Sequence, residues 1–215
     1  MVAQDEASFR ESGPATDSPR SSDYDDVRAR ILRAAEERFV RYGFGKTTMA
    51  EIAADCSMSA GNLYRFFDNK GDIAAASASQ WMMSLEADLS AIAQDTTRSP
   101  SSRLKSIIHA KLDALADLVE AEPHLEELIE HVCKSRDDLV ASHRIALQRL
   151  YARVIADGVA AGDYDVEDAE ASADAVQVAT VGLFHHNIIC TVPFDKLRSD
   201  ADKIMGLVLR GLGQR

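Results

Sequence analysis

Apolar side chains recur three and four residues apart through most of this chain, and that period restricts the possible folds more than any other feature. In the first such segment the spacing places Val27, Ile31, Ala35 and Phe39 on one face of a helix. Later segments repeat the period between short breakers, and none shows the alternation typical of a half-buried strand. High Ala and Leu content without runs of β-branched residues favours the same state. The sequence therefore predicts an all-α protein.

About nine helices follow from the positions of the breakers, among them Gly43, Pro100, Pro123 and Pro193. The predicted ranges are 25–42, 48–56, 60–66, 70–94, 100–121, 124–134, 137–161, 167–190 and 198–212, each within about two to four residues. Residues 1–24 are rich in Ser, Asp, Glu, Arg, Pro and Gly and carry few apolar side chains. We expect them to form a disordered arm.

Composition is that of a globular protein with a real core, since 46% of the residues are hydrophobic and 27% are charged. No apolar run approaches the roughly 18 residues needed to span a bilayer, and the first residues do not have the pattern of a secretory signal. The three cysteines, Cys56, Cys133 and Cys190, lie far apart. We therefore expect reduced thiols in a cytoplasmic protein that has no contact with a membrane.

A net charge of -11 argues against DNA binding until the charge is divided along the chain. Residues 24–72 carry eight Lys and Arg against eight Asp and Glu, whereas residues 73–215 carry 14 against 22. Phosphate contact depends on local basic side chains rather than on the charge of the whole chain. The segment 24–72 is therefore permissive for DNA, although its charge alone does not indicate DNA.

The most informative segment runs from Thr47 to Asp72. Thr48 and Glu51 form a T-x-x-E capping box that begins a short helix. After the turn Ser57-Met58, Ser59 is suited to cap a second short helix, which Leu63 and Phe67 anchor to the core. Two short helices joined by such a turn form the helix-turn-helix layout.

The outer faces of the second helix carry side chains that packing does not explain. A major groove does explain them, because Arg donates to guanine, Asn pairs with adenine and Tyr reaches phosphate. Lys70, just after the capping residue Asn69, opposes the helix dipole, and a phosphate contact would offset that cost. Alternatively, Tyr64 and Lys70 are ordinary surface residues and Phe66 belongs to the core. The outward residues are Ala60, Gly61, Asn62, Tyr64, Arg65 and Phe66.

From Ile31 to Asp72 the order of features resembles the TetR family of regulators. The resemblance implies a homodimer that binds a palindromic operator and releases it when a small ligand binds. The implied domains are a helix-turn-helix domain over 25–72 and a ligand-binding and dimerisation domain over 73–215. The matching positions are Ala34, Ala35, Phe39, Tyr42, Gly43, Thr47, Thr48, Ile52, Ala53, the run Ser59 to Phe67, and Lys70.

The resemblance also implies the DNA contacts. Thr47 or Thr48, Tyr64 and Lys70 would meet phosphates, while Gly61, Asn62, Arg65 and Phe66 would lie near base edges. Ser59 and Ala60 begin the same helix and belong to the same predicted site. Two positions depart from the family pattern. Ser57 stands where the turn usually has Gly, and Phe66 stands where a polar residue is more common.

The sequence of the second predicted domain, residues 73–215, is less specific about function than that of the first. The pocket for an apolar effector would be lined by some of Trp81, Met82, Tyr151, Phe184 and His185. The simplest interpretation of the first four is that they belong to the core, and His185 is alternatively a core or interface histidine. The acidic balance of residues 73–215 weakly favours a neutral or cationic ligand. We expect the dimer to form through the last two long helices, by way of Ala175, Val178, Val181, Ile188, Ile204, Leu207 and Val208.

Other functions remain open at this point. Glu127 and His131, near His124 and Cys133, have a spacing that could hold a metal, but a polar helix face is the more ordinary interpretation, and we expect neither metal nor cofactor. No nucleophile–base pair, phosphate loop or paired carboxylates appear, so we expect no enzymatic activity. The alternatives are a constitutive DNA-bound protein that recruits a partner protein, or a helical binding module or enzyme with no DNA role.

Overall fold

The structure, a computed structural model, describes residues 19–121 and 124–213. Every regular element within these ranges is helical, which confirms the all-α prediction. The helices are α1 (Pro19–Tyr42), α2 (Met49–Asp55), α3 (Ala60–Leu63), α4 (Lys70–Gln94), α5 (Pro100–Ala121), α6 (Leu125–Ser135), α7 (Asp137–Ala161), α8 (Ala169–Thr180), the 3₁₀ turn η1 (Val181–Phe184), α9 (His186–Ile189) and α10 (Phe194–Leu212).

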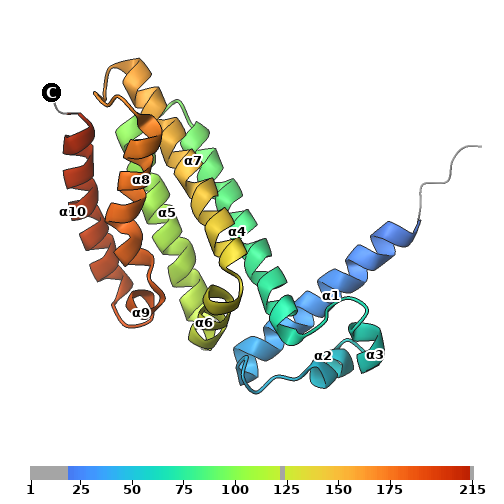
Figure 1. The fold of residues 1–215 in the computed structure, drawn as a ribbon. Coiled ribbons are helices and arrows are strands. Elements are labelled where there is room, and N and C mark those ends of the chain that lie inside the picture. Colours follow the sequence, from blue (N-terminus) through green and yellow to red (C-terminus); the bar gives the residue numbers. More distant parts are fainter. Residues whose placement is uncertain (1–18, 122–123, 214–215) are drawn as a thin grey trace, which may run out of the picture.

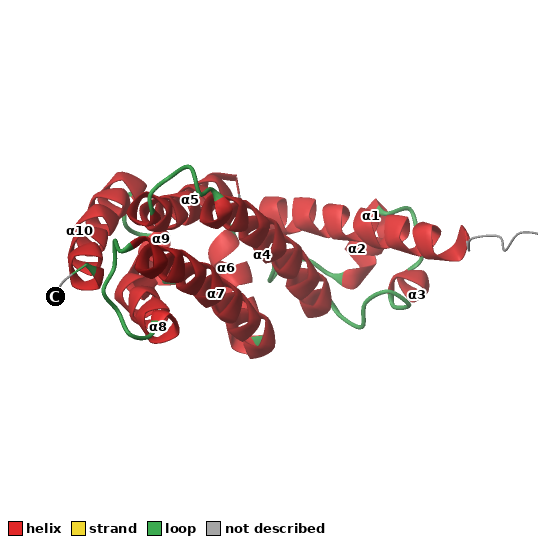
Figure 2. Cartoon of the chain, turned by 90° about the horizontal axis from the view of Figure 1, so that it is seen from above, coloured by secondary structure: helices red, strands yellow, loops and turns green. Residues whose placement is uncertain are grey.

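Two units of unequal size share the long helix α4. Helices α1, α2 and α3 lie together at one end of the molecule, and α4 runs from them into a bundle formed with α5, α7, α8 and α10 (Figure 1). The view from above shows the same order, with α8 and α10 at the end of the molecule opposite α1–α3 (Figure 2). The described helices include none long and apolar enough to cross a membrane.

Each unit has its own hydrophobic core. The small core contains Ile31, Ile52 and Leu63 and continues into α4 as far as Ile73 and Ala74. The large core begins at Leu85 and extends to Leu212. Because Ile73 and Ala74 belong to the first core, α4 is packed into both units and links them mechanically.

The first helix begins earlier than the sequence predicted. Residues 19–24, assigned to a disordered arm, form the first turns of α1. The ring of Tyr24 stacks on that of Phe66, with 4.8 Å between centroids, and this contact gives the early turns a tertiary partner. The rest of the predicted arm, residues 1–18, lies outside the described residues.

The predicted helix over 167–190 is wrong, because α8 ends at Thr180 and a 3₁₀ turn and the short α9 follow. The Thr180 hydroxyl donates to the carbonyl oxygen of Val176, 2.9 Å away, a local bond that competes with helix continuation. His185 then adopts an extended conformation between the two short turns. The last helix begins at Phe194, directly after Pro193, rather than near residue 198.

Candidate nucleic-acid interface and interior cavity

Helix α2 begins with the capping box that the sequence predicted. The backbone N–H of Thr48 donates to the Glu51 carboxylate at 2.9 Å, and the Glu51 N–H donates to the Thr48 hydroxyl at 3.4 Å. Hydrogen bonds from Thr48 lower the pKa of Glu51. Arg38 of α1 pairs with both Glu51 and Asp55, which fixes α2 against α1.

The turn between α2 and α3 uses a left-handed residue. Ser57 has φ of +54°, a conformation that favours glycine, and it is the only described residue other than glycine with positive φ. The N–H of Met58 donates to the carbonyl of Ala53 at 2.9 Å and closes the turn. Ser57 therefore adopts the backbone conformation that glycine favours.

Helix α3 presents several of the predicted DNA-contacting side chains to solvent. Ser59 accepts a hydrogen bond from the N–H of Asn62 and caps the helix as predicted. Tyr64 is 51% exposed, and Arg65 and Gly61 are also exposed. The helix is shorter than the predicted 60–66, because bonds such as Arg65 N–H to Asn62 O tighten its end into 3₁₀ geometry.

Other predicted contact residues are engaged inside the protein. Thr47 is 1% exposed, and its hydroxyl donates to the carbonyl of Gly43 at 2.9 Å, so Thr48 is the accessible member of the pair. Phe66 is half-buried against Tyr24, while Ala60 and Asn62 are half-buried on α3.

The Lys70 ammonium donates to three carbonyl oxygens, those of Phe44 at 2.7 Å, Thr47 at 2.9 Å and Gly45 at 3.2 Å. These three contacts use all the donors of a lysine side chain. A cation in the first turn of α4 is therefore explained by the α1–α2 loop alone. A phosphate contact by Lys70, which stays a prediction, requires the exchange of one of these bonds.

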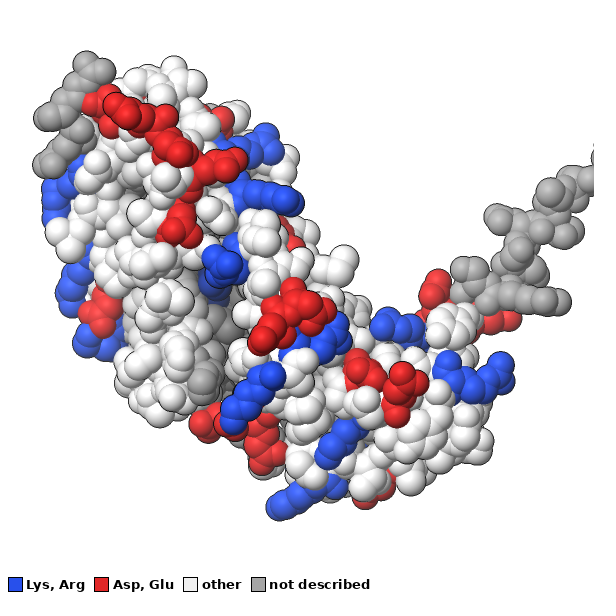
Figure 3. Space-filling view, in the orientation of Figure 1, with Lys and Arg blue, Asp and Glu red and all other residues white. Residues whose placement is uncertain are grey.

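The visible charge distribution on the small unit is mixed. Lys and Arg alternate with Asp and Glu over α1–α3, and neither sign forms a large patch (Figure 3). This agrees with the equal count of acids and bases over residues 24–72. Any DNA affinity must therefore come from specific contacts rather than from a broad basic field.

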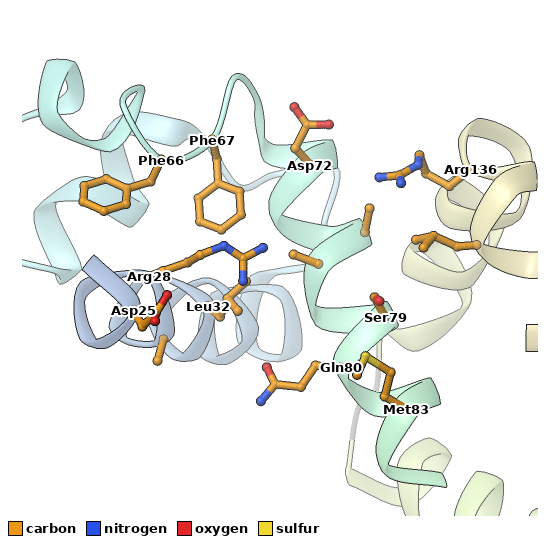
Figure 4. Close-up of a pocket in the computed structure, with 14 residues that line it drawn as sticks. Asp25, Arg28, Leu32, Phe66, Phe67, Asp72, Ser79, Gln80, Met83 and Arg136 are labelled. Carbon is orange, nitrogen blue, oxygen red and sulfur yellow. The ribbon is translucent and has the colours of Figure 1, made fainter. Parts of the chain in front are cut away.

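An open groove of about 630 Å³ lies between α1, α4 and the beginning of α7. Arg28 lies over the ring of Phe67, 5.0 Å from its centroid, and Arg136 points into the groove from the opposite side (Figure 4). Asp25 and Asp72 line the same groove, and Arg136 pairs with Asp138 at 2.8 Å. None of the five predicted ligand-contacting residues lines it.

A second cavity, of about 350 Å³, lies inside the bundle next to the small unit. Its volume is at the small end of the range for small-molecule sites, and its wall is mostly apolar. Helices α4, α5, α6 and α7 each contribute to the wall. The lining residues are Glu36, Ser77, Ala78, Trp81, Met82, Lys111, Leu115, Leu118, Leu128, Ile129, Val132, Cys133, His143, Phe184 and Ile189.

The structure brings together three of the five residues predicted to contact a ligand. Trp81, Met82 and Phe184 line this cavity. Tyr151 is 1% exposed in the bundle core, where burial raises its pKa, and it does not line the cavity. His185 is exposed and also lies outside the wall.

Sequence reasoning missed the polar groups of this cavity. Lys111 lies 3.7 Å from the centroid of the Phe184 ring, and burial lowers its pKa to about 8. His143 Nδ1 lies 2.6 Å from a Glu86 carboxylate oxygen, and burial lowers the pKa of His143 despite that contact. The sequence did contain a sign that Lys111 faces inward, because it follows Ile107 by four residues and so lies on the apolar face of α5.

Helix α6 connects the cavity with the small unit. The Glu127 carboxylate accepts a hydrogen bond from the N–H of Gly45 at 3.0 Å. The His131 ring packs on the ring of Phe44 with 4.3 Å between centroids. Leu128 both lines the cavity and packs against the small core. These contacts give Glu127 and His131 a structural role, and no group of three possible metal ligands occurs in the described ranges.

Apolar side chains remain exposed on α8, at the beginning of η1 and on α10. Val178, Val181 and Leu207 are 64%, 60% and 65% exposed, and Ala175 is exposed beside them. The other three predicted interface residues, Ile188, Ile204 and Val208, are half-buried against the bundle core. The dimer interface through these residues stays a prediction.

Two family models match this chain. The model "Bacterial regulatory proteins, tetR family" covers residues 31–76, which include α2 and α3. The model "Tetracyclin repressor-like, C-terminal domain" covers residues 100–205 of the bundle. The chain belongs to the TetR family. The features from Ile31 to Asp72 that suggested this family in the sequence are thereby confirmed.

Two curated relatives of this TetR-family chain come from Pseudomonas putida. They are "Probable HTH-type transcriptional regulator ArpR" and "HTH-type transcriptional regulator TtgR", and each is 25% identical over 114 residues. Each match covers 53% of this chain and 54% of the relative. The chain thus spans about half the length of the curated relatives it matches.

Solved structures share the fold of this TetR-family chain at low identity. A TetR-family regulator from Pectobacterium atrosepticum has a TM-score of 0.70 at 20% identity and covers 91% of this chain and 98% of its own. SmeT, repressor of the Stenotrophomonas maltophilia efflux pump SmeDEF, has 0.67 at 19%, covering 87% and 90%. Thermus thermophilus FadR, in complex with lauroyl-CoA, has 0.63 at 20%, covering 87% and 96%.

Proposed function

We propose that this chain is a transcriptional repressor that binds a palindromic operator as a homodimer and releases it when a small, largely apolar ligand binds. The observation that carries the proposal is the position of α6. One face of α6 lines the cavity, and the other contacts the loop that precedes the DNA-reading helices. The neighbours SmeT and FadR, solved with triclosan and lauroyl-CoA, support a ligand role for such a domain.

On the DNA side, Tyr64 and Arg65 are the principal readers. Both are exposed in the turn directly after α3, where Arg65 can donate to a base edge and Tyr64 to a phosphate. Thr48, Ser59 and Gly61 are exposed beside them at the starts of α2 and α3. A protein with this role acts in the compartment that holds its operator, which for a bacterial regulator is the cytoplasm.

The dimer is proposed to form through α8 and α10. In this arrangement Val178, Val181 and Leu207 become buried across a two-fold axis as part of a four-helix bundle. Two α3 helices then lie about 34–36 Å apart, one turn of duplex. A ligand that favours a different separation lowers operator affinity by its differential affinity for the two states.

The α6 contacts suggest how the cavity changes that separation. A ligand that displaces Leu128 displaces α6, and with it the Glu127–Gly45 hydrogen bond and the His131–Phe44 contact. The same loop is bound by Lys70 at the beginning of α4. Movement of α6 and tilt of α4 are therefore one coupled displacement. A constitutive, ligand-free DNA-bound protein has no use for such a cavity.

Selection of duplexes from a random pool tests the DNA role. Purified protein is expected to enrich palindromic sites. Arg65→Ala and Tyr64→Ala are expected to weaken binding to the selected duplex, by about 5- to 150-fold for Arg65. Arg149→Ala, which removes an exposed arginine from α7, serves as the matched control. Unchanged affinity in both α3 variants contradicts the assignment of the reading surface.

Sedimentation equilibrium tests the dimer. The wild-type chain is expected to be a dimer at micromolar concentration, and Val178→Asp with Leu207→Asp is expected to give a folded monomer that binds half of the operator weakly. A wild-type monomer at that concentration refutes the interface.

A further inference from the structure

The bundle cavity contains two polar groups that its own walls do not satisfy. The Ser77 hydroxyl belongs to a side chain only 8% exposed and has no hydrogen-bond partner in the structure. Lys111 faces the Phe184 ring, and no carboxylate among the described residues forms an ion pair with it. Buried polar groups without partners are costly, so their presence in one apolar cavity requires an explanation.

We propose that the cavity binds an effector with an apolar body and one acidic group, which Lys111 holds as its anion and to which the Ser77 hydroxyl donates a hydrogen bond. The inference rests on the proposed ligand-gated function and names the chemical class of the ligand. It runs against the acidic balance of residues 73–215, because a charge on the wall of a largely apolar cavity outweighs distant, solvated acids.

The other ionisable groups near Lys111 support an anion rather than a cation. His143 lies close enough for the Lys111 charge to lower the pKa of His143. The carboxylate of Glu86 on α4 is engaged by His143 of α7. Glu36 also lines the cavity, yet burial alone accounts for the lowered pKa of Lys111, and no carboxylate counteracts it. The ammonium therefore has an unfilled counter-charge position.

The apolar wall of the cavity determines the size and character of the ligand's apolar body. Trp81, Met82 and Phe184 provide aromatic and thioether surface, and Leu115, Leu128 and Val132 provide aliphatic surface. Desolvation of an anion in such a cavity is unfavourable unless a cation receives it, so Lys111 is expected to decide selectivity among ligands of equal size. The cavity volume of about 350 Å³ admits a single chain or one to two rings.

Three eight-carbon probes that differ only in the head group test this selectivity. Trp81 is the single tryptophan of the chain and lines the cavity, so its emission reports occupancy directly. At pH 7 the full-length protein is expected to bind octanoate at least about tenfold more tightly than 1-octanol, with octylamine the weakest of the three. This comparison needs no variant.

Variants assign the selectivity to residues. Lys111→Met is expected to weaken octanoate binding about tenfold or more while retaining 1-octanol, and Ser77→Ala to weaken octanoate binding severalfold. Lys105→Met removes an exposed lysine from the same helix and is expected to change nothing. Circular dichroism checks that each variant is folded.

Several results overturn the inference. They are equal binding of octanoate and 1-octanol, tighter binding of octylamine, octanoate affinity unaffected by Lys111→Met, or no response of Trp81 emission and thermal stability to any probe. Operator affinity at saturating octanoate is measured separately. If the protein binds octanoate selectively but its operator affinity is unchanged, the acid-binding site is upheld and ligand gating is refuted. If the three probes bind equally and release the operator, gating is upheld and the acid-binding site is refuted.

Discussion

Ser57 carries backbone strain in the turn that separates α2 from α3. Its φ of +54° is a conformation in which a Cβ atom crowds the following carbonyl, and glycine avoids that crowding. Ser57→Gly is therefore expected to raise the free energy of unfolding by about 0.5–1 kcal/mol, after the larger chain entropy of glycine is subtracted. Urea denaturation measures the change, and Ser57→Ala, which keeps the strain, is the control. A glycine variant no more stable than the alanine variant contradicts the explanation.

The buried ammonium of Lys111 is expected to make the stability of the protein depend on pH. Its pKa of about 8 in the folded protein lies below the usual 10.5, so between these values the unfolded chain binds more protons and stability rises with pH. Lys111→Met removes the buried ammonium and is expected to stabilise the unliganded protein at pH 7 by up to about 3 kcal/mol. The difference between variant and wild type should shrink as pH rises from 8 to 10.5.

Thermal or urea unfolding at several pH values checks this prediction, with Lys105→Met as the control. The other ionisable side chains of the cavity, among them Cys133, are present in both proteins and cancel in the difference between variant and wild type. A constant difference across the window shows that Lys111 is not desolvated in the folded state.

Individual residues of the site differ in whether their contacts could be predicted from the sequence. The caps Thr48, Ser59 and Asn69 were predictable, because each bonds to a backbone N–H within three residues. The partners of Lys70 were not, since its carbonyl acceptors lie 23 to 26 residues away. A local pattern shows that a cation is in an unfavourable position, but only the fold shows what compensates it.

At the scale of elements, the close approach of Tyr164 to α7 depends on Gly158. A Cβ atom at Gly158 would lie 2.2 Å from the Tyr164 ring, which is buried and whose hydroxyl lies 3.0 Å from the Ser101 hydroxyl. Gly158→Ala is expected to destabilise the bundle by about 1–3 kcal/mol. Gly211→Ala on α10, where a Cβ meets nothing within 4 Å, is the matched control and should be neutral or slightly stabilising.

Thermal unfolding of the two variants separates packing from helix propensity. Both substitutions improve the intrinsic helix preference of their segment, so a loss of stability confined to Gly158→Ala must come from the Tyr164 contact. If both variants gain stability, the ring relaxes and the packing is not tight.

Helix ends were predictable where the chain has a capping residue, a proline or a glycine at the boundary. The ranges 70–94, 100–121 and 137–161 agree with α4, α5 and α7, which are bounded by Asn69, Pro100 and Gly162. The break after α8 was missed, because a threonine hydroxyl bonding to the carbonyl four residues earlier occurs within continuous helices as well. Its consequence here, a 3₁₀ turn that brings Phe184 to the cavity wall, depends on packing against α5.

The whole molecule is joined by two elements, α4 and α6, which touch both units. α4 is a continuous helix embedded in both cores, whereas α6 meets the small unit through a few side chains. The sequence predicted both helices. It did not predict that α6 contacts the small unit, because Glu127 and Gly45 are 82 residues apart. In the proposed function, the α6 contacts are therefore the part of the connection between the cavity and α2–α3 that can be removed without disturbing either core.

The α6 contacts lead to a prediction about communication alone. Glu127→Ala removes the acceptor of the Gly45 N–H from an exposed position, so the fold, the cavity and the α3 surface are expected to persist. Octanoate should still change Trp81 emission with unaltered affinity, and the operator should still bind. The ratio of operator affinities without and with octanoate is expected to fall by about 2- to 30-fold.

Glu127→Gln is the control for this prediction, because its amide oxygen still accepts from Gly45 and should retain most of the response. Fluorescence anisotropy of labelled operator, titrated with and without octanoate, gives both affinities from one preparation. If the alanine variant responds to octanoate like wild type, the displacement passes through α4 alone and α6 serves only as part of the cavity wall. If the alanine and glutamine variants lose the response equally, the carboxylate charge rather than its hydrogen bond carries the coupling.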